Sequence, residues 1–180
     1  MQKNKRFPLS RRRFTHGSLL SLAGLTLFPS LFASRILAQA AQSPTPMKIG
    51  IIGSGNIGGS VGLRWAEAGH EIMFSSRNPD QLGELVAQAG PKAQAGFPPQ
   101  AAEFGDIVFV AVPYAAMPQV GEDIAPLVQG KIVIDCGNPY VRRDGEMAAV
   151  ALEKGTGVAS AEFFPGVRLV RAFNALSWTE

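Results

Sequence analysis

Cysteine, histidine and charge are all scarce in this sequence. Cys136 is the single cysteine of 180 residues, so the chain cannot form an internal disulfide. Of two histidines, only His70 lies beyond residue 40, and we interpret it as a turn residue without a catalytic partner. Because no Cys/His cluster is present, we expect no metal site. Cys136 is interpreted as a packed residue at a strand end, since a redox role would need a resolving cysteine.

Acidic residues are absent from residues 1–40, which hold seven of the 17 lysines and arginines. Residues 10–14 (SRRRF) have the twin-arginine pattern of a polar residue, two arginines, a spacer and an aromatic residue. An apolar stretch over 17–33 and the small-residue pattern Ala38-Gln39-Ala40 follow. We interpret 1–40 as a twin-arginine signal peptide, which predicts the twin-arginine translocase as a partner and a periplasmic location.

The alternatives for this segment are a retained membrane anchor and a disordered basic tail. A spanning helix needs about 20 apolar residues. The run over 17–33 is shorter and contains Pro29, so the signal peptide is favoured.

Charge changes sign once the signal is set aside. Beyond residue 40, ten basic residues face 14 acidic ones, a net charge of −4 in place of +3. The basic balance of the whole chain therefore belongs to the signal, and we expect no nucleic-acid partner. Residues 41–46 are interpreted as a linker, and residues 47–180 as one domain.

Short apolar runs alternate with helical patterns along this domain. Strands are expected over 48–52, 71–74, 93–96, 106–112, 131–135 and 167–172. Helices are expected over 56–68, from Asn78-Pro79 to the residue before Gly90, over 100–104 and over 117–127. Asn78 is the expected N-cap, while Asp144 and Glu146 are interpreted as a solvated turn. The alternation predicts an α/β fold: a Rossmann-type doubly wound, mostly parallel sheet in a single domain.

A glycine-rich turn joins the first predicted strand to the first predicted helix. Gly53-Ser54-Gly55-Asn56-Ile57-Gly58 is a G-x-G-x-x-G sequence. Its glycines suit a tight turn, a close approach to a pyrophosphate and close helix–strand packing, and the helix N-terminus favours phosphate. The pattern alone is weak, but its position between strand and helix predicts nucleotide binding rather than a structural turn.

The end of the second predicted strand bears on which nucleotide is bound. NAD-binding proteins place an acidic residue there for the ribose 2′-hydroxyl. This sequence has Ser75-Ser76-Arg77, two hydroxyls and an arginine that can donate to a 2′-phosphate. The residues therefore favour NADP(H) over NAD(H), the alternative being that Arg77 is only a solvated turn charge.

Five segments together resemble a known family. They are 48–58, 75–79, 111–114 (AVPY), 135–140 (DCGNPY) and 170–176 (VRAFNAL). The sequence resembles the NADPH-dependent reductases of coenzyme F420, in a superfamily that includes the N-terminal domains of pyrroline-5-carboxylate reductases. The resemblance extends over about residues 47–176.

The resemblance implies roles for further residues. Residues implied to border the nicotinamide are Ala111, Val112, Pro113 and Tyr114. Residues implied to lie on the side of the second substrate are Asn138, Pro139, Phe173 and Asn174. Family members continue beyond the Phe-Asn motif, whereas this sequence stops at Glu180, so we expect a shortened chain or a fragment. A second subunit could complete its substrate pocket, which leaves a homodimer open.

Three hypotheses for function follow. The first is an NADP(H)-dependent oxidoreductase that transfers hydride between NADPH and a small-molecule acceptor: coenzyme F420, another deazaflavin, a flavin or a similar carrier. Such a reaction needs positioning more than acid–base groups, so no catalytic residue is assigned. The second is a non-catalytic NADP-binding or redox-sensing module. The third is the nucleotide-binding half of an imine or ketone reductase.

Overall fold

Six parallel strands form one sheet in the order β3-β2-β1-β4-β5-β6. The structure is a computed structural model that describes residues 45–175. The strands are β1 (Lys48–Ile52), β2 (Glu71–Ser75), β3 (Ala93–Gly96), β4 (Ile107–Val110), β5 (Ile132–Asp135) and β6 (Arg168–Arg171). The strand order is that of a Rossmann fold, so the predicted fold class is confirmed.

Helices connect the strands in chain order. They are α2 (Asn56–Glu67), α3 (Gly83–Ala89), α4 (Pro98–Phe104), α5 (Met117–Ile124), α6 (Val141–Lys154) and α7 (Thr156–Phe163). Short 3-10 helices η1 (Pro79–Leu82), η2 (Tyr114–Ala116) and η3 (Ala125–Leu127) lie beside α3 and α5.

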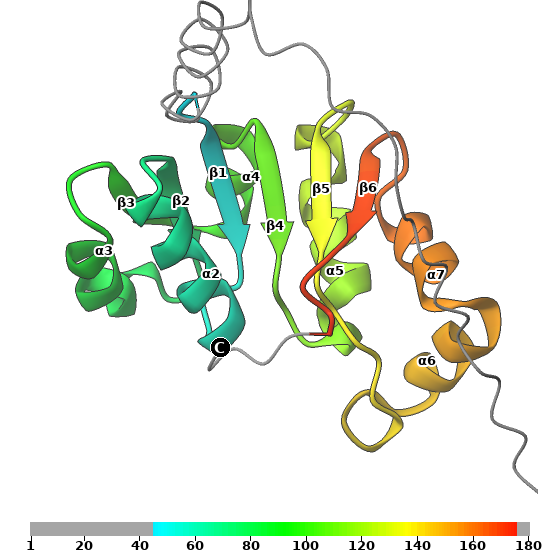
Figure 1. Ribbon diagram of the computed structural model, residues 1–180. Coiled ribbons are helices and arrows are strands. Elements are labelled where there is room, and N and C mark those ends of the chain that lie inside the picture. The colour runs from blue at the N-terminus through cyan, green and yellow to red at the C-terminus, as the bar shows by residue number, and fades with distance from the viewer. Residues whose placement is uncertain (1–44, 176–180) are drawn as a thin grey trace, which may run out of the picture. The chain divides into compact units, whose positions relative to one another are not determined.

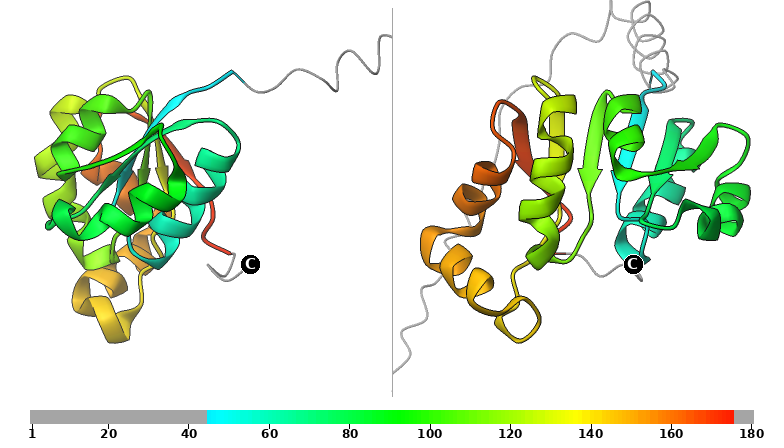
Figure 2. Two further views of the ribbon diagram at one scale, coloured as in Figure 1. Left: turned by 90° about the vertical axis from the view of Figure 1, so that its left-hand side faces the viewer. Right: turned by 180° about the vertical axis from the view of Figure 1, so that it is seen from behind.

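The helices lie on both faces of the sheet. In Figure 1, α2 lies in front of the sheet while α4 and α5 lie behind it, and Figure 2 shows the same two layers from the side and from behind. Ile51, Phe74 and Phe109 belong to the core under α2 and α3. Ile52, Val110 and Val133 belong to the core under α4, α5 and α7. The strands are apolar on both faces because each face is covered by helices.

All carboxyl ends of the strands lie at one edge because the sheet is parallel throughout (Figure 1). The connection after β1 runs to one side of the sheet and the connection after β4 to the other, so the sheet order reverses between these two strands. Open α/β sheets bind ligands in the crevice at such a switch point. The loops after β1, β2, β4, β5 and β6 therefore surround one candidate site.

Several predicted boundaries differ from the structure, and two of the differences have a local cause. Asn78 is not a side-chain N-cap: the segment starts as η1, and the Asn78 N–H donates to Ser76 Oγ at 3.0 Å. A local serine turn replaces the expected cap. The predicted 106–112 strand is shorter, because Pro113 lacks an N–H for the ladder and the chain turns into η2.

The helices α6 and α7 were not predicted from the sequence. Gly145 has φ +64° inside α6, so an initial turn is separated from the regular helix that follows. Asp144, interpreted as part of a solvated turn, is 7% exposed and accepts hydrogen bonds within that initial turn. The solvated-turn interpretation is therefore wrong for Asp144, because one glycine in a left-handed conformation folds the turn onto the domain.

Predictions for the signal peptide and most of the linker lie outside the described residues. Within residues 45–175, no helix combines the length and apolar character needed to cross a membrane.

Candidate dinucleotide site

The loop of residues 53–58, called the phosphate loop below, connects β1 to α2. Each of its three glycines has a different environment. Gly53 has φ +92°, and a Cβ there would lie 2.7 Å from the Ala111 carbonyl oxygen. Among the residues that the structure describes, a Cβ at Gly55 would meet nothing within 4 Å, so the described part of the domain leaves this side of the backbone open to a ligand. A Cβ at Gly58 would overlap the Gly53 carbonyl oxygen. The loop thus has the tight turn, open approach and close packing expected of a dinucleotide fingerprint.

Ser54 offers a direct test of whether a phosphate fits this loop. Its Oγ is buried and has no hydrogen-bond partner among the described residues. Its N–H donates to the Ser75 carbonyl at 3.0 Å, which ties the loop to the end of β2. A buried hydroxyl without a partner is costly unless a ligand satisfies it. Together with the open side of Gly55, the loop fits a dinucleotide pyrophosphate.

The end of β2 presents only part of the predicted Ser75-Ser76-Arg77 set. Ser75 is fully buried, and its Oγ donates to the Ile51 carbonyl at 2.6 Å. Its hydroxyl points into the sheet. The prediction that the Ser75 hydroxyl contacts a 2′-phosphate is therefore wrong. Ser76 is half-buried and Arg77 is exposed, and these two side chains are available to a ligand.

In the segment after β4 too, some of the predicted site residues are accessible and one is buried. Ala111 and Val112 are half-buried and Pro113 is exposed, beside the phosphate loop. Tyr114 is fully buried, with its hydroxyl 3.2 Å from Ser160 Oγ and its ring against Phe163. Burial is the main reason that the pKa of Tyr114 is raised above its ordinary value. The Tyr114 ring is therefore a core residue, which favours packing over the contact with the nicotinamide that the resemblance implies.

The two substrate-side motifs come together at the ends of β5 and β6. Asn138 Nδ2 donates to the Asn174 carbonyl at 2.7 Å. Phe173 has φ +64°, a conformation that costs energy for a residue with a side chain. Its ring packs edge-on against Trp65 and Phe109, with centroid distances of 5.7 Å in both pairs.

Pro139 is buried, so it supports the loop rather than facing a ligand, while Asn138 is half-buried and Phe173 is 36% exposed. The structure therefore brings the two motifs together, and their contact with a substrate stays a prediction.

Asp144 is an anchor of this region that sequence reasoning missed. Its carboxylate accepts hydrogen bonds from the backbone N–H groups of Tyr140 at 2.9 Å and Ala115 at 3.2 Å. The Arg143 guanidinium also pairs with it at 2.8 Å. These bonds, that of Arg143 first, lower the pKa of Asp144 from 3.8 to about 2. The carboxylate thereby joins the segment after β4 to the loop after β5, which sequence spacing cannot reveal.

Neither Cys136 nor His70 faces the site with a reactive group. Cys136 is 4% exposed, and burial raises the pKa of its thiol to about 12, as expected for a packed residue. His70 is 7% exposed, and its Nδ1 accepts the Met47 N–H at 3.2 Å near the amino ends of β1 and β2. Both therefore serve the packing of the domain.

The fold and the loop define a dinucleotide-binding Rossmann protein, and comparison with known proteins narrows the class. The family of F420-dependent NADP oxidoreductases matches residues 48–139. The chain belongs to this family.

Two characterised relatives match at similar identity. Metalloreductase STEAP3 of Rattus norvegicus is 29% identical over 133 residues, which cover 72% of this chain and 25% of the rat protein. The F420-dependent NADP reductase of Methanothermobacter thermautotrophicus is 29% identical over 144 residues, which cover 73% of this chain and 62% of the relative. The chain thus spans less than two thirds of the length of either relative.

Solved structures agree with the fold. A provisional F420-dependent NADP reductase from Arthrobacter sp. FB24 has a TM-score of 0.63 at 21% identity, covering 74% of this chain and 64% of that one. At this identity the match supports the Rossmann-like fold alone.

Proposed function

We propose that this protein binds NADP(H) in preference to NAD(H) and transfers hydride between NADPH and a deazaflavin, flavin or similar acceptor. The single observation that carries the nucleotide preference is the exposed Arg77 beside Ser76 at the end of β2. No acidic residue stands between Ile72 and Asn78, so nothing there repels a 2′-phosphate. Membership of a family of NADP oxidoreductases supports the proposal.

Different residues at the carboxyl edge of the sheet would bind different parts of the nucleotide. The phosphate-loop N–H groups and Ser54 Oγ would hold the pyrophosphate, and Ser76 and Arg77 would hold the 2′-phosphate. When bound, NADPH supplies the hydride. Ala111–Pro113 would border the nicotinamide, and Asn138 and Phe173 would approach the second substrate. Positioning two rings in contact is the main requirement of such a transfer.

A fluorescence titration with NADPH and NADH tests the nucleotide preference. We expect NADPH to bind at least about tenfold more tightly, a difference of about 1.4 kcal/mol. Replacing Arg77→Gln should weaken NADPH binding by about tenfold and change NADH binding less than about twofold, because only NADPH carries the 2′-phosphate.

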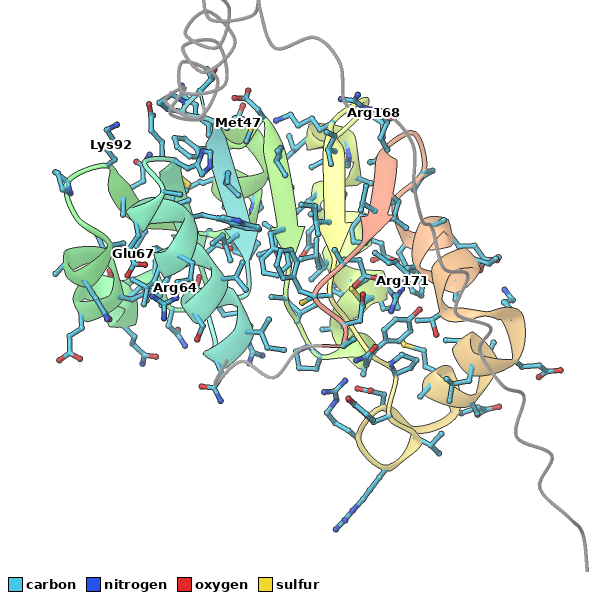
Figure 3. All side chains as sticks on the ribbon, viewed as in Figure 1. Met47, Arg64, Glu67, Lys92, Arg168 and Arg171 are labelled. Atoms are coloured by element: carbon cyan, nitrogen blue, oxygen red, sulfur yellow. The ribbon has the colours of Figure 1, made fainter. Side chains whose placement is uncertain are left out.

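Arg64→Gln is the matched control. Arg64 is an exposed arginine on α2 that pairs with Glu67 at 3.0 Å. Figure 3 labels both residues. Equal affinity of the unaltered protein for the two nucleotides, or equal losses in both arginine variants, would contradict the proposed role of Arg77.

A second candidate is an NADP-binding module without turnover. The observation that favours it is that the family match ends at residue 139 and so excludes the Phe173-Asn174 motif. This candidate predicts tight NADPH binding with no oxidation of NADPH by coenzyme F420, FMN or FAD. Oxidation of NADPH by any of these acceptors, followed by the loss of NADPH absorbance, would rule it out.

A further inference from the structure

A partly buried arginine contacts the loop that carries Asn138, and this contact suggests a role beyond an ion pair. Arg171 is the last residue of β6, and Asp135 is its register partner at the end of β5. Asp135 is fully buried, and the Arg171 side chain is 21% exposed. The Arg171 guanidinium pairs with the Asp135 carboxylate. Figure 3 shows Arg171 at the carboxyl edge of the sheet.

The same guanidinium reaches two further partners. One terminal nitrogen, Nη2, donates to the Gly137 carbonyl at 2.7 Å. The other, Nη1, donates to Ser160 Oγ at 3.0 Å, and that hydroxyl lies 3.2 Å from the Tyr114 hydroxyl. A planar guanidinium can direct several donors at once, which an ammonium group cannot do with the same geometry. Arg171 therefore links β5, α7 and the segment that follows β4.

Gly137 is held from both sides. Its N–H donates to Asp135 Oδ1 at 2.6 Å, and its carbonyl accepts the bond from Arg171. That carbonyl belongs to the peptide group that joins Gly137 to Asn138, so its orientation determines the direction in which Asn138 leaves. Asn138 in turn donates to the Asn174 carbonyl, which lies three residues beyond Arg171.

An ion pair alone does not account for this arrangement. Burying two opposite charges offers little net stability compared with apolar residues of similar size. Arg168, at the other end of the same strand, is exposed, and its side chain has no hydrogen bond among residues 45–175. The two arginines of β6 thus differ in whether they contact the site loops (Figure 3).

We propose that Arg171 is a positioning residue: its guanidinium orients the Gly137–Asn138 peptide and thereby places Asn138 for the second substrate. The predicted effect of Arg171 on turnover rests on the proposed function. The predicted effect of Arg171 on the loop does not, because its hydrogen bonds are formed without a substrate.

The test compares Arg171→Lys with Arg168→Lys in the full chain. Lysine retains the charge opposite Asp135 and loses the fork that reaches Gly137 and Ser160. Hydrogen exchange read by mass spectrometry should be about tenfold faster for peptides covering residues 136–140 in Arg171→Lys, while peptides from β1 and β4 keep their protection. NADPH affinity should change less than about twofold, and kcat/KM for the acceptor should fall by about tenfold or more.

Equal exchange of the 136–140 loop in the two lysine variants would overturn the proposal. This result can be read even if the protein oxidises no NADPH, so failure of the proposed function is distinguishable. Faster loop exchange with unchanged kcat/KM in an active protein would also overturn it, because the loop would then move without affecting the substrate.

Asp135→Asn is the second variant and decides the outcome if Arg171→Lys fails to fold. Asparagine keeps an acceptor for the Gly137 N–H, and Arg171 keeps its bond to the Gly137 carbonyl. The proposal expects loop exchange within about threefold of the unaltered protein. Exchange as fast as in an unfolded peptide would show that the charge pair, rather than the guanidinium contact with Gly137, holds the loop, and would overturn it.

Discussion

At the level of single residues, the phosphate loop contains two glycines, Gly55 and Gly58, that are required for different reasons. Gly55 is needed for the approach of a ligand, since a Cβ there would meet no atom of residues 45–175 within 4 Å. Gly58 is needed for packing, since a Cβ would overlap the Gly53 carbonyl and lie 3.1 Å from Ile51. Binding and stability should therefore separate between the two positions.

Replacing Gly55→Ala should leave the thermal midpoint unchanged and weaken NADPH binding by about tenfold, or about 1.4 kcal/mol, because the methyl group enters the space left for phosphate. Gly58→Ala should lower both affinity and the free energy of unfolding, the latter by about 1–3 kcal/mol, because the loop must shift. Thermal denaturation and nucleotide titration measure the two effects. A destabilised Gly55→Ala with normal affinity would contradict this division.

The carboxylate of Asp144 predicts a pH dependence of stability. Its pKa in the folded protein is about 2, below its ordinary value of 3.8, so the ionised form stabilises the folded state above about pH 4. The stabilisation is lost as the pH falls through about 2. Because its partner Arg143 is 46% exposed, we expect a contribution of about 1 kcal/mol.

Urea denaturation of Asp144→Asn between about pH 6 and 2 measures this contribution. The variant should be less stable than the unaltered protein at the upper end of this pH range, and the two should converge in acid. Glu146→Gln, at an exposed position two residues away, is the control and should follow the unaltered protein. A constant difference across the range would show that Asp144 acts through packing alone.

At the scale of elements, α2 lies against the sheet through glycines. A Cβ at Gly62 would overlap the ring of Phe74 and a methyl group of Ile51. A Cβ at Gly59 would lie 3.6 Å from a Leu85 methyl group, an ordinary contact. The helix can approach β1 and β2 closely because Gly62 has no side chain.

Gly62→Ala should therefore destabilise the protein by about 1–3 kcal/mol, since α2 must move away from the sheet. Gly59→Ala in the same helix should be neutral or stabilising by up to about 1 kcal/mol, since alanine has the higher helix propensity. Chemical denaturation of the two variants measures the difference. Similar free energies of unfolding would contradict the proposed close approach at Gly62.

The elements also show where sequence patterns are informative. The strands β1, β4 and β5 are recognisable because each is a short apolar run buried on both faces. The helices α6 and α7 lie at the far end of the sheet, and Gly145 and Gly155 interrupt their pattern with positive φ angles (Figure 1). A periodicity argument needs an uninterrupted segment, and these elements do not offer one.

At the scale of the whole molecule, we propose that residues 1–40 direct export through the twin-arginine route. The double variant Arg11→Lys/Arg12→Lys should retain the protein in the cytoplasm of a bacterial host that has this pathway, because the paired arginines carry the signal. Cell fractionation and intact-mass measurement check this, with processing expected after Ala40.

The control for export is Arg6→Lys/Arg35→Lys, which changes two other arginines of the same segment. It should leave the amount of exported protein unchanged. Equal export of both double variants would contradict the twin-arginine interpretation.

The alternation of strands and helices, the phosphate loop and the lack of an acidic residue at the end of β2 could all be predicted from the residues alone. These are local features, because periodicity, glycine spacing and residue type act within a few positions of the chain. Which side chains face the site, in contrast, depends on the packing of the whole domain. Ser75 and Tyr114 are buried by the register of neighbouring strands and by α7, while Asp144 and Arg171 reach the loops from segments distant in sequence. Such contacts depend on which strands are neighbours and which helix covers them, and local sequence does not encode that arrangement residue by residue.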